Sequence, residues 1–316
     1  RFGLWGVAYL EALVKSADVL AELDAERLAA APAAESAQPL LLAAPAPSPN
    51  AVDIPADPRN FGEYLACLGL LGLLASRQPD LSAKWTAQGF RLLGDSYSDV
   101  LAAVDRLLTM EIHLDESALR PAQDDDKFPP LQLRFGEGQL PILLNNWLRP
   151  DFKDRSDWKL SVGNTRSVGI LRGLKAAALQ LRPQLVSAAQ VLQLGATMKE
   201  RFRFDAGTSW SALDAGFTLN EDDRFSTVRV FLELLSILGV QHAFAPPADR
   251  EPFRYMVWQQ PLPATLCLLA AKGLLPGPSQ TLVPRRVTSG HMKDIFTSEL
   301  TLANEVSPCL PTYLIV

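Results

Sequence analysis

The sequence predicts a mixed α+β fold, in which helices pack with a small, mostly antiparallel sheet and one more helix is tethered at the N-terminus. Three patterns indicate this fold. Residues 61–75 are apolar nearly all round, as expected of a central helix. Residues 201–205 alternate between charged and aromatic side chains, as a half-buried strand does. Residues 31–58 are rich in Ala and Pro, and therefore separate an N-terminal helix from the rest.

The N-terminal module, residues 1–30, is predicted to be one amphipathic helix. Its apolar stripe recurs at helical spacing and consists of Leu10, Leu13, Val14, Ala17 and Leu20. Such a stripe is expected to be buried, and we interpret it as a protein interface. The partner is either the body of this chain, a neighbouring subunit or a domain upstream of Arg1. Because no initiator Met and no signal-peptide pattern is present, we expect the sequence to be a piece of a longer chain.

Residues 31–58 are predicted to be an extended linker, and residues 59–316 to be a globular α+β body. Asn60 suits the N-cap of the first body helix, and Glu63 stands three residues later, as in a capping box. Gly69 and Gly72 weaken helix propensity but permit another backbone to approach closely. A second amphipathic helix is expected over 97–110, and an exposed acidic loop over 115–130.

The second half of the body alternates between helical and strand signals. Helices are expected over 166–180, from Val228 to Leu238 with Gly239 as the stop, and over 264–272. Strands are expected at 201–205, around Tyr255, and once or twice within 281–302.

Composition limits where the protein works. No uninterrupted run of about 18 apolar residues occurs, so no membrane span or membrane partner is expected. The three cysteines, Cys67, Cys267 and Cys309, are far apart among apolar neighbours, which favours reduced thiols in a reducing compartment such as the cytoplasm. The net charge of −5 excludes a uniformly polyanion-binding surface, although a local basic patch remains compatible with it.

Catalytic signatures are missing from the sequence. It has no phosphate-cradling loop, no nucleophile elbow and no cluster of His and Cys at zinc-ligand spacing. We therefore expect no enzyme activity, no cofactor and no metal. The strongest alternative is a metal-dependent nuclease that uses Asp205, Asp214 and Asp222, because convergent carboxylates can hold two metal ions on a phosphate.

Basic residues concentrate in one segment of this acidic chain. Residues 151–205 contain ten basic and five acidic residues, with aromatic residues beside them. Because cations hold phosphates and aromatic faces stack on bases, this segment is a candidate nucleic-acid surface. The predicted contacts are Lys159, Asn164, Arg166, Arg172, Lys175, Arg201 and Arg203, with a second group of Arg285, Arg286 and Lys293. An ordinary basic helix, whose cations pair with acids elsewhere, explains the segment equally well.

Four groups of segments, taken in order, resemble one protein family. They are the run Asn60–Leu74; Asn146–Leu148 with Trp158–Gly163; Phe202–Asp205 with Leu213–Phe217 and Phe231–Gln241; and Tyr255–Trp258 with Pro261–Pro263. They are similar to segments of the accessory effector-complex proteins of type I-G (formerly I-U) CRISPR systems. The likeness extends over roughly residues 60–300, and the N-terminal arm lies outside it.

The resemblance implies a non-catalytic subunit of a crRNA-guided type I interference complex, and with it a prokaryotic cytoplasmic location. It implies contacts with crRNA or target DNA and with other subunits, and the helicase–nuclease is a further candidate partner. In such machines base pairing reads the sequence while proteins hold the backbone. A scaffold that contacts protein alone remains a third possibility.

Overall fold

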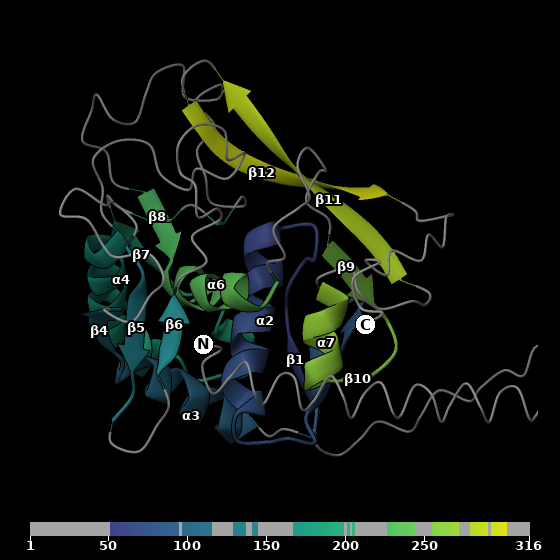
Figure 1. Cartoon of the computed structure of the whole chain (residues 1–316), viewed down its shortest axis with the longest axis horizontal. Coiled ribbons are helices and arrows are strands. Elements are labelled where there is room, and N and C mark those ends of the chain that lie inside the picture. The colour runs from purple at the N-terminus through teal and green to yellow at the C-terminus, as the bar shows by residue number, and fades with distance from the viewer. Residues whose placement is uncertain are drawn as a thin grey trace, which may run out of the picture. The chain divides into compact units, whose positions relative to one another are not determined.

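The computed structural model is an α+β fold with five α-helices and several small antiparallel sheets among the residues that it describes (Figure 1). The described residues are 51–94, 97–115, 129–136, 141–144, 167–198, 201–202, 204–205, 226–243, 255–271, 279–289 and 292–301. The predicted fold class is thereby confirmed for the body. The predicted N-terminal helix lies outside the described residues.

The first sheet has four strands in the order β1-β3-β2-β10, all antiparallel to their neighbours. Its strands are β1 (Ala51–Ile54), β2 (Ser82–Thr86), β3 (Gly89–Leu93) and β10 (Leu262–Pro263). Along β1, Val52 and Ile54 are buried while Ala51 and Asp53 are exposed, so the sheet presents one face to the core. β1 therefore lies within the segment that composition predicted to be linker.

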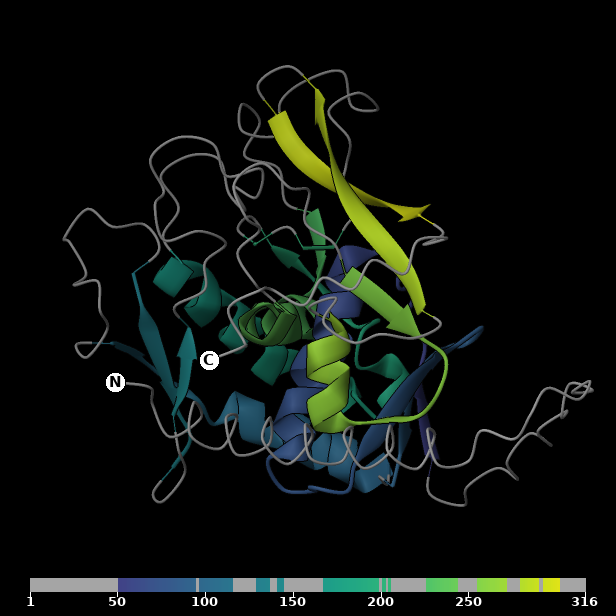
Figure 2. The same cartoon turned by 45° about the vertical axis from the view of Figure 1, so that its right-hand side comes forward.

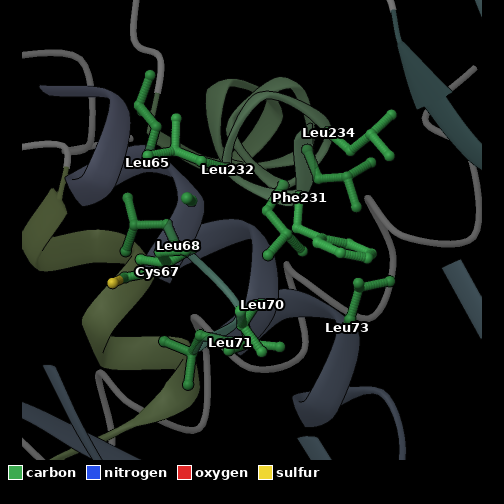
Figure 3. Close-up of a cluster of buried hydrophobic side chains, with 14 of the residues drawn as sticks. Leu65, Cys67, Leu68, Leu70, Leu71, Leu73, Phe231, Leu232 and Leu234 are labelled. Carbon is green, nitrogen blue, oxygen red and sulfur yellow. The ribbon is translucent and has the colours of Figure 1, made fainter. Parts of the chain in front are cut away.

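Helix α2 (Phe61–Ala75) is the centre of the body. The helix begins at Asn60, whose Oδ1 accepts a hydrogen bond from the Gly62 amide at 3.1 Å, so the predicted N-cap is confirmed. Every residue from Phe61 to Leu74 is buried. Helix α6 (Val230–Ala243) packs on α2, and its Phe231, Leu232 and Leu234 lie among the leucines of α2 (Figure 3).

The two helices approach closely at glycines. A Cβ added to Gly69 would lie 2.0 Å from the Leu235 carbonyl oxygen, and one added to Gly239 would lie 1.9 Å from that of Leu65. The prediction that Gly69 admits a neighbouring backbone is confirmed. The prediction that Gly239 ends its helix is wrong: α6 runs on to Ala243, because this glycine serves helix packing and not a C-terminal turn.

An aromatic cluster joins α2 to the sheets. Tyr64 stacks on Trp85 of β2 at 5.4 Å between ring centroids, and its hydroxyl donates to the Met256 carbonyl at 2.7 Å. Trp258 donates from its indole nitrogen to the Ala83 carbonyl at 2.9 Å. These contacts connect the first sheet with β9 (Tyr255–Trp258), which belongs to a second sheet in the order β12-β11-β9.

The remaining elements surround this core (Figures 1 and 2). The helices are α3 (Tyr97–Leu108), α4 (Ser167–Leu181) and α7 (Ala264–Ala271), with the short 3-10 turns η1 (Arg182–Gln184) and η2 (Ala188–Gln190). The strands are β4 (Glu111–Leu114), β5 (Leu131–Arg134), β6 (Ile142–Leu144), β7 (Gly195–Met198), β8 (Ser226–Arg229), β11 (Ser279–Ser289) and β12 (Met292–Thr301). The helices predicted over 97–110, 166–180 and 264–272 and the closing strands are thus present. Most of the predicted acidic loop, residues 116–128, lies outside the described residues.

Candidate functional site

Charged side chains gather inside the body where α2 and α6 begin. Glu63 lies in the first turn of α2, Glu233 in the first turn of α6, and Arg229 at the end of β8. Arg201 and Asp205 join them from the segment before β8. The exposed fractions of the five residues run from 0% to 8%. Two cations and three carboxylates therefore share one buried cluster, which we call the ion cluster.

Arg229 is the centre of the ion cluster. Its Nε donates to Asp205 Oδ2 at 2.6 Å, a second guanidinium nitrogen donates to Asp205 Oδ1, and the third donates to Glu63 Oε1 at 2.6 Å. Burial opposes its charge, but the Asp205 and Glu63 carboxylates raise the pKa of Arg229 above its ordinary value. The fork geometry of a guanidinium suits this bidentate contact, which a lysine could not make.

Asn60 links the helix cap to the ion cluster. Its Oδ1 caps α2, while its Nδ2 donates to Asp205 Oδ1 at 3.0 Å and to Glu63 Oε1 at 3.2 Å. The other oxygen of Glu63 accepts from the Asp57 amide at 2.6 Å. Glu63 therefore acts differently from the predicted capping box, since it binds the amide of Asp57 and the side chain of Asn60.

Glu233 binds the backbone of residues 202–205. One oxygen accepts from the Phe202 amide at 3.0 Å, and the other accepts from the Phe204 and Asp205 amides at 3.0 Å and 3.3 Å. This arrangement explains why the predicted strand is absent from the described part of 201–205: its amides donate to a carboxylate and not to a neighbouring strand. The alternation does not correspond to alternating burial, because Arg201 and Asp205 are buried as well as Phe202 and Phe204.

Burial raises the pKa of Glu233 to about 7, against an opposing effect from the positive charge of Arg201. The backbone amides of Phe204 and Asp205 also favour the ionised form, whereas the negative charge of Asp205 disfavours it. The protonation state of this one side chain therefore depends on pH near neutrality.

Asp205, one of the three carboxylates of the nuclease alternative, lies in the ion cluster. Both oxygens of Asp205 are held by Arg229, and Asn60 adds a further hydrogen bond, so this carboxylate is poorly placed to hold a metal. Among the described residues, no group of three or more His, Cys, Asp or Glu could hold a metal ion. Asp214 and Asp222 lie outside those residues. The ion cluster instead connects four segments of the core.

Two of the predicted nucleic-acid contacts lie on α4. Arg172 is exposed, and Lys175 is half-buried with its Nζ donating to the Met110 carbonyl at 2.6 Å. Within the described part of the chain, neither forms an ion pair, whereas Arg59, Arg91 and Arg182 each pair with an aspartate. The exposed face of α4 is otherwise uncharged and contains Gly169, Ala176, Leu179 and Gln180.

The other predicted site residues are distributed as follows. Arg201 is 7% exposed and lies with Glu233 in the ion cluster, so its burial removes it from an accessible phosphate-binding face. Arg285 and Arg286 lie on β11 opposite Thr297 and Phe296, and Lys293 lies on β12 opposite Thr288. The predicted site residues outside the described parts of the chain are Lys159, Asn164, Arg166, Arg203, Leu10, Leu13, Val14, Ala17 and Leu20.

Sequence reasoning missed the ion cluster. Arg229 and Glu233 stand inside the apolar run from Val228 to Leu238, and a charge within such a run is the signal that could have drawn attention to them. Their partners could not be named from sequence, because Glu63 is 166 positions away from Arg229.

Comparison of the chain with family models, curated proteins and solved structures gave no match. None of the helices in the described ranges is long and apolar enough to span a lipid bilayer.

Proposed function

We propose that this chain is a non-catalytic subunit of a crRNA-guided type I CRISPR interference ribonucleoprotein, in which it contacts nucleic-acid backbone and neighbouring protein subunits. The ordered set of segments that resembles the type I-G accessory proteins supports the proposal. The ion cluster is consistent with it, because its carboxylates hold the core together and are not open to a substrate.

The observation that carries the proposal is the charge of α4. Arg172 and Lys175 stand three positions apart, so they lie on neighbouring turns of one helix. No acid among the described residues pairs with either of them, although the chain as a whole is acidic. Arg172 is exposed and can neutralise a phosphate, whereas Lys175 would add its charge from beside the Met110 carbonyl. Neutralised phosphates release counterions and strengthen binding.

Exposed apolar side chains in α4 and after it suit protein contact. Leu179 of α4 is 50% exposed, and Val186, between η1 and η2, is 65% exposed. Large exposed apolar side chains beside a cation are typical of interfaces, in which charged residues other than Arg are depleted at the centre. A subunit that touches nucleic acid with one part of α4 and protein with the next would need both kinds of side chain.

The decisive experiment is the salt dependence of nucleic-acid binding by the assembled complex. The Arg166→Ala, Arg172→Ala, Lys175→Ala triple variant should weaken binding about equally for all sequences and lower the salt slope by about one unit for every phosphate that is no longer neutralised. The matched control is the Arg59→Ala, Arg91→Ala, Arg134→Ala variant, which removes the same charge from other surfaces. An unchanged slope and affinity in the first variant would leave α4 with a protein-binding role only.

A cleavage assay tests the nuclease alternative. Purified protein with Mg²⁺ or Mn²⁺ should leave labelled DNA and RNA intact. Metal-dependent cleavage that disappears in the Asp205→Ala variant would refute the non-catalytic proposal.

A further inference from the structure

The strands β11 and β12 form a ribbon that extends past the rest of their sheet. β11 has 11 residues, but β9 pairs with it only from Ser279 to Leu282. From Val283 to Ser289, β11 pairs with β12 alone among the described strands. Figures 1 and 2 show the two yellow strands running beyond the end of β9. α2 also lies near β12.

The length of the ribbon is large for a hairpin with so little sheet beside it. At about 3.3 Å per residue, residues 283–289 reach about 20 Å past the last pair with β9. A two-stranded hairpin is marginally stable by itself in water, because it has no third strand or helix to cover its faces. The part of the ribbon beyond β9 therefore has no third strand among the described residues, which is compatible with a contact outside the chain.

Basic residues lie toward the turn of the ribbon. Arg285 and Arg286 are on β11 and Lys293 is on β12, where Lys293 faces Thr288 across the ribbon, two positions from Arg286. Residues 285–289 and 292–297 contain these three cations and one acid, Asp294. The acid Glu299 lies nearer to β9, opposite Val283. The excess of positive charge is thus in the half that is farther from β9.

The shape of the ribbon fits one kind of anionic partner. The major groove of B-form DNA is about 12 Å wide and admits a two-stranded β-ribbon, whereas the major groove of double-stranded RNA is too narrow for side chains to enter. The register shifts between Val287 and Thr288, and a bulge of this kind increases the local twist of a strand pair. A twisted ribbon follows a helical groove better than a flat one.

We propose that residues 283–289 of β11 and 292–297 of β12 form a DNA-binding ribbon that lies along the groove of a DNA duplex, with Arg285, Arg286 and Lys293 against its phosphates. This inference rests on the proposed nucleic-acid contact and specifies its form: a duplex, held by a β-ribbon separate from α4.

The test compares charge-neutralised variants of the assembled complex on three probes: a mixed-sequence DNA duplex, one of its single strands, and an RNA duplex of equal length. The Arg285→Gln, Arg286→Gln, Lys293→Gln variant should lower the salt slope for the DNA duplex by about 2 to 3 units. Binding of the other two probes should stay close to that of the wild type. The Arg59→Gln, Arg91→Gln, Arg134→Gln variant removes the same charge and should leave all three unchanged.

A conservative variant controls for loss of folding. Arg285→Lys with Arg286→Lys keeps both charges and should retain the salt slope of the wild type. A slope that falls equally in this variant would indicate damage to the ribbon and overturn the proposal.

The remaining outcomes separate this inference from the proposed function. If the ribbon variant binds the DNA duplex normally while the α4 variant does not, the ribbon proposal fails and the proposed function stands. If neither variant changes binding, both fail. If the ribbon variant loses subunits or weakens single-strand binding equally, the ribbon contacts protein or single strands, and the duplex proposal is overturned.

Discussion

At the scale of single residues, Arg229 and Glu233 connect segments of the core that are far apart in the sequence. Arg229 bonds two carboxylates that come from segments 24 and 166 positions away in the sequence. Glu233 binds three described amides of another segment. Removing one partner of a buried ion pair leaves an uncompensated charge, which generally costs about 3–5 kcal/mol. We therefore expect a substitution at Arg229 or Glu233 to destabilise the body.

The raised pKa of Glu233 leads to a prediction about pH. Its folded value of about 7 lies above the ordinary value of 4.5, so the folded state binds the proton more tightly than the unfolded state does. The resulting stabilisation is complete below pH 4.5 and is lost as the pH rises to 7, and it amounts to about 3 kcal/mol at most. Because glutamine does not titrate, the free energy of unfolding of the wild type should fall relative to Glu233→Gln over this interval.

Chemical denaturation of both proteins from pH 4 to 8 measures this difference. Taking the difference cancels the titration of groups that lie away from Glu233. If the wild type instead gains stability relative to Glu233→Gln as the pH rises, the prediction is wrong. Arg201 and the three amides then hold Glu233 ionised and outweigh its burial.

At the scale of elements, the crossing of α2 and α6 depends on glycines. Gly239→Ala should raise helix propensity by about 1 kcal/mol but lower overall stability, because its Cβ would lie 1.9 Å from the Leu65 carbonyl oxygen. Overpacking of this kind costs about 1–3 kcal/mol, and a clash with backbone belongs at the upper end. Gly169→Ala in α4 is the matched control, since an added Cβ there meets nothing within 4 Å.

The melting temperature of Gly239→Ala should therefore lie below that of the wild type, and that of Gly169→Ala should not. Gly169→Ala should be neutral or slightly stabilising. A Gly239→Ala protein that melts with the wild type would mean that the two helices separate at no cost.

The elements also show which features a sequence can reveal. α2, α4 and α7 follow from apolar runs and helical spacing, which are local properties. The strands β1 to β6 were not predicted, because each has only three to five residues and little room for a pattern. The ion cluster was missed for a different reason: its side chains are far apart in sequence, and nothing local specifies which of them meet. Gly239 was predicted to end its helix, but the reason for a glycine there is the close approach of α2, which the local sequence does not reveal.

At the scale of the whole molecule, the N-terminal arm provides the last prediction. The described core residues begin at Val52, and β1 pairs with β3 from Ala51 onward. Deleting residues 1–50 should therefore leave the melting temperature of the body nearly unchanged while weakening its assembly with other subunits. Thermal unfolding and co-purification measure the two effects. A truncated body that aggregates or unfolds would place the arm within the domain core.

The burial of α2 on all sides also determines when the chain can fold during its synthesis. Tyr64 of α2 bonds Met256, 192 positions later, and the carbonyl of Gly62 accepts from Ser236, 174 positions later. A ribosome that adds about 5–20 residues per second needs about 10–40 s to make that stretch. During that time an apolar helix has none of its later partners and is exposed to aggregation. We therefore expect α2 to remain the most aggregation-prone part of the nascent chain until α6 and β9 have been made.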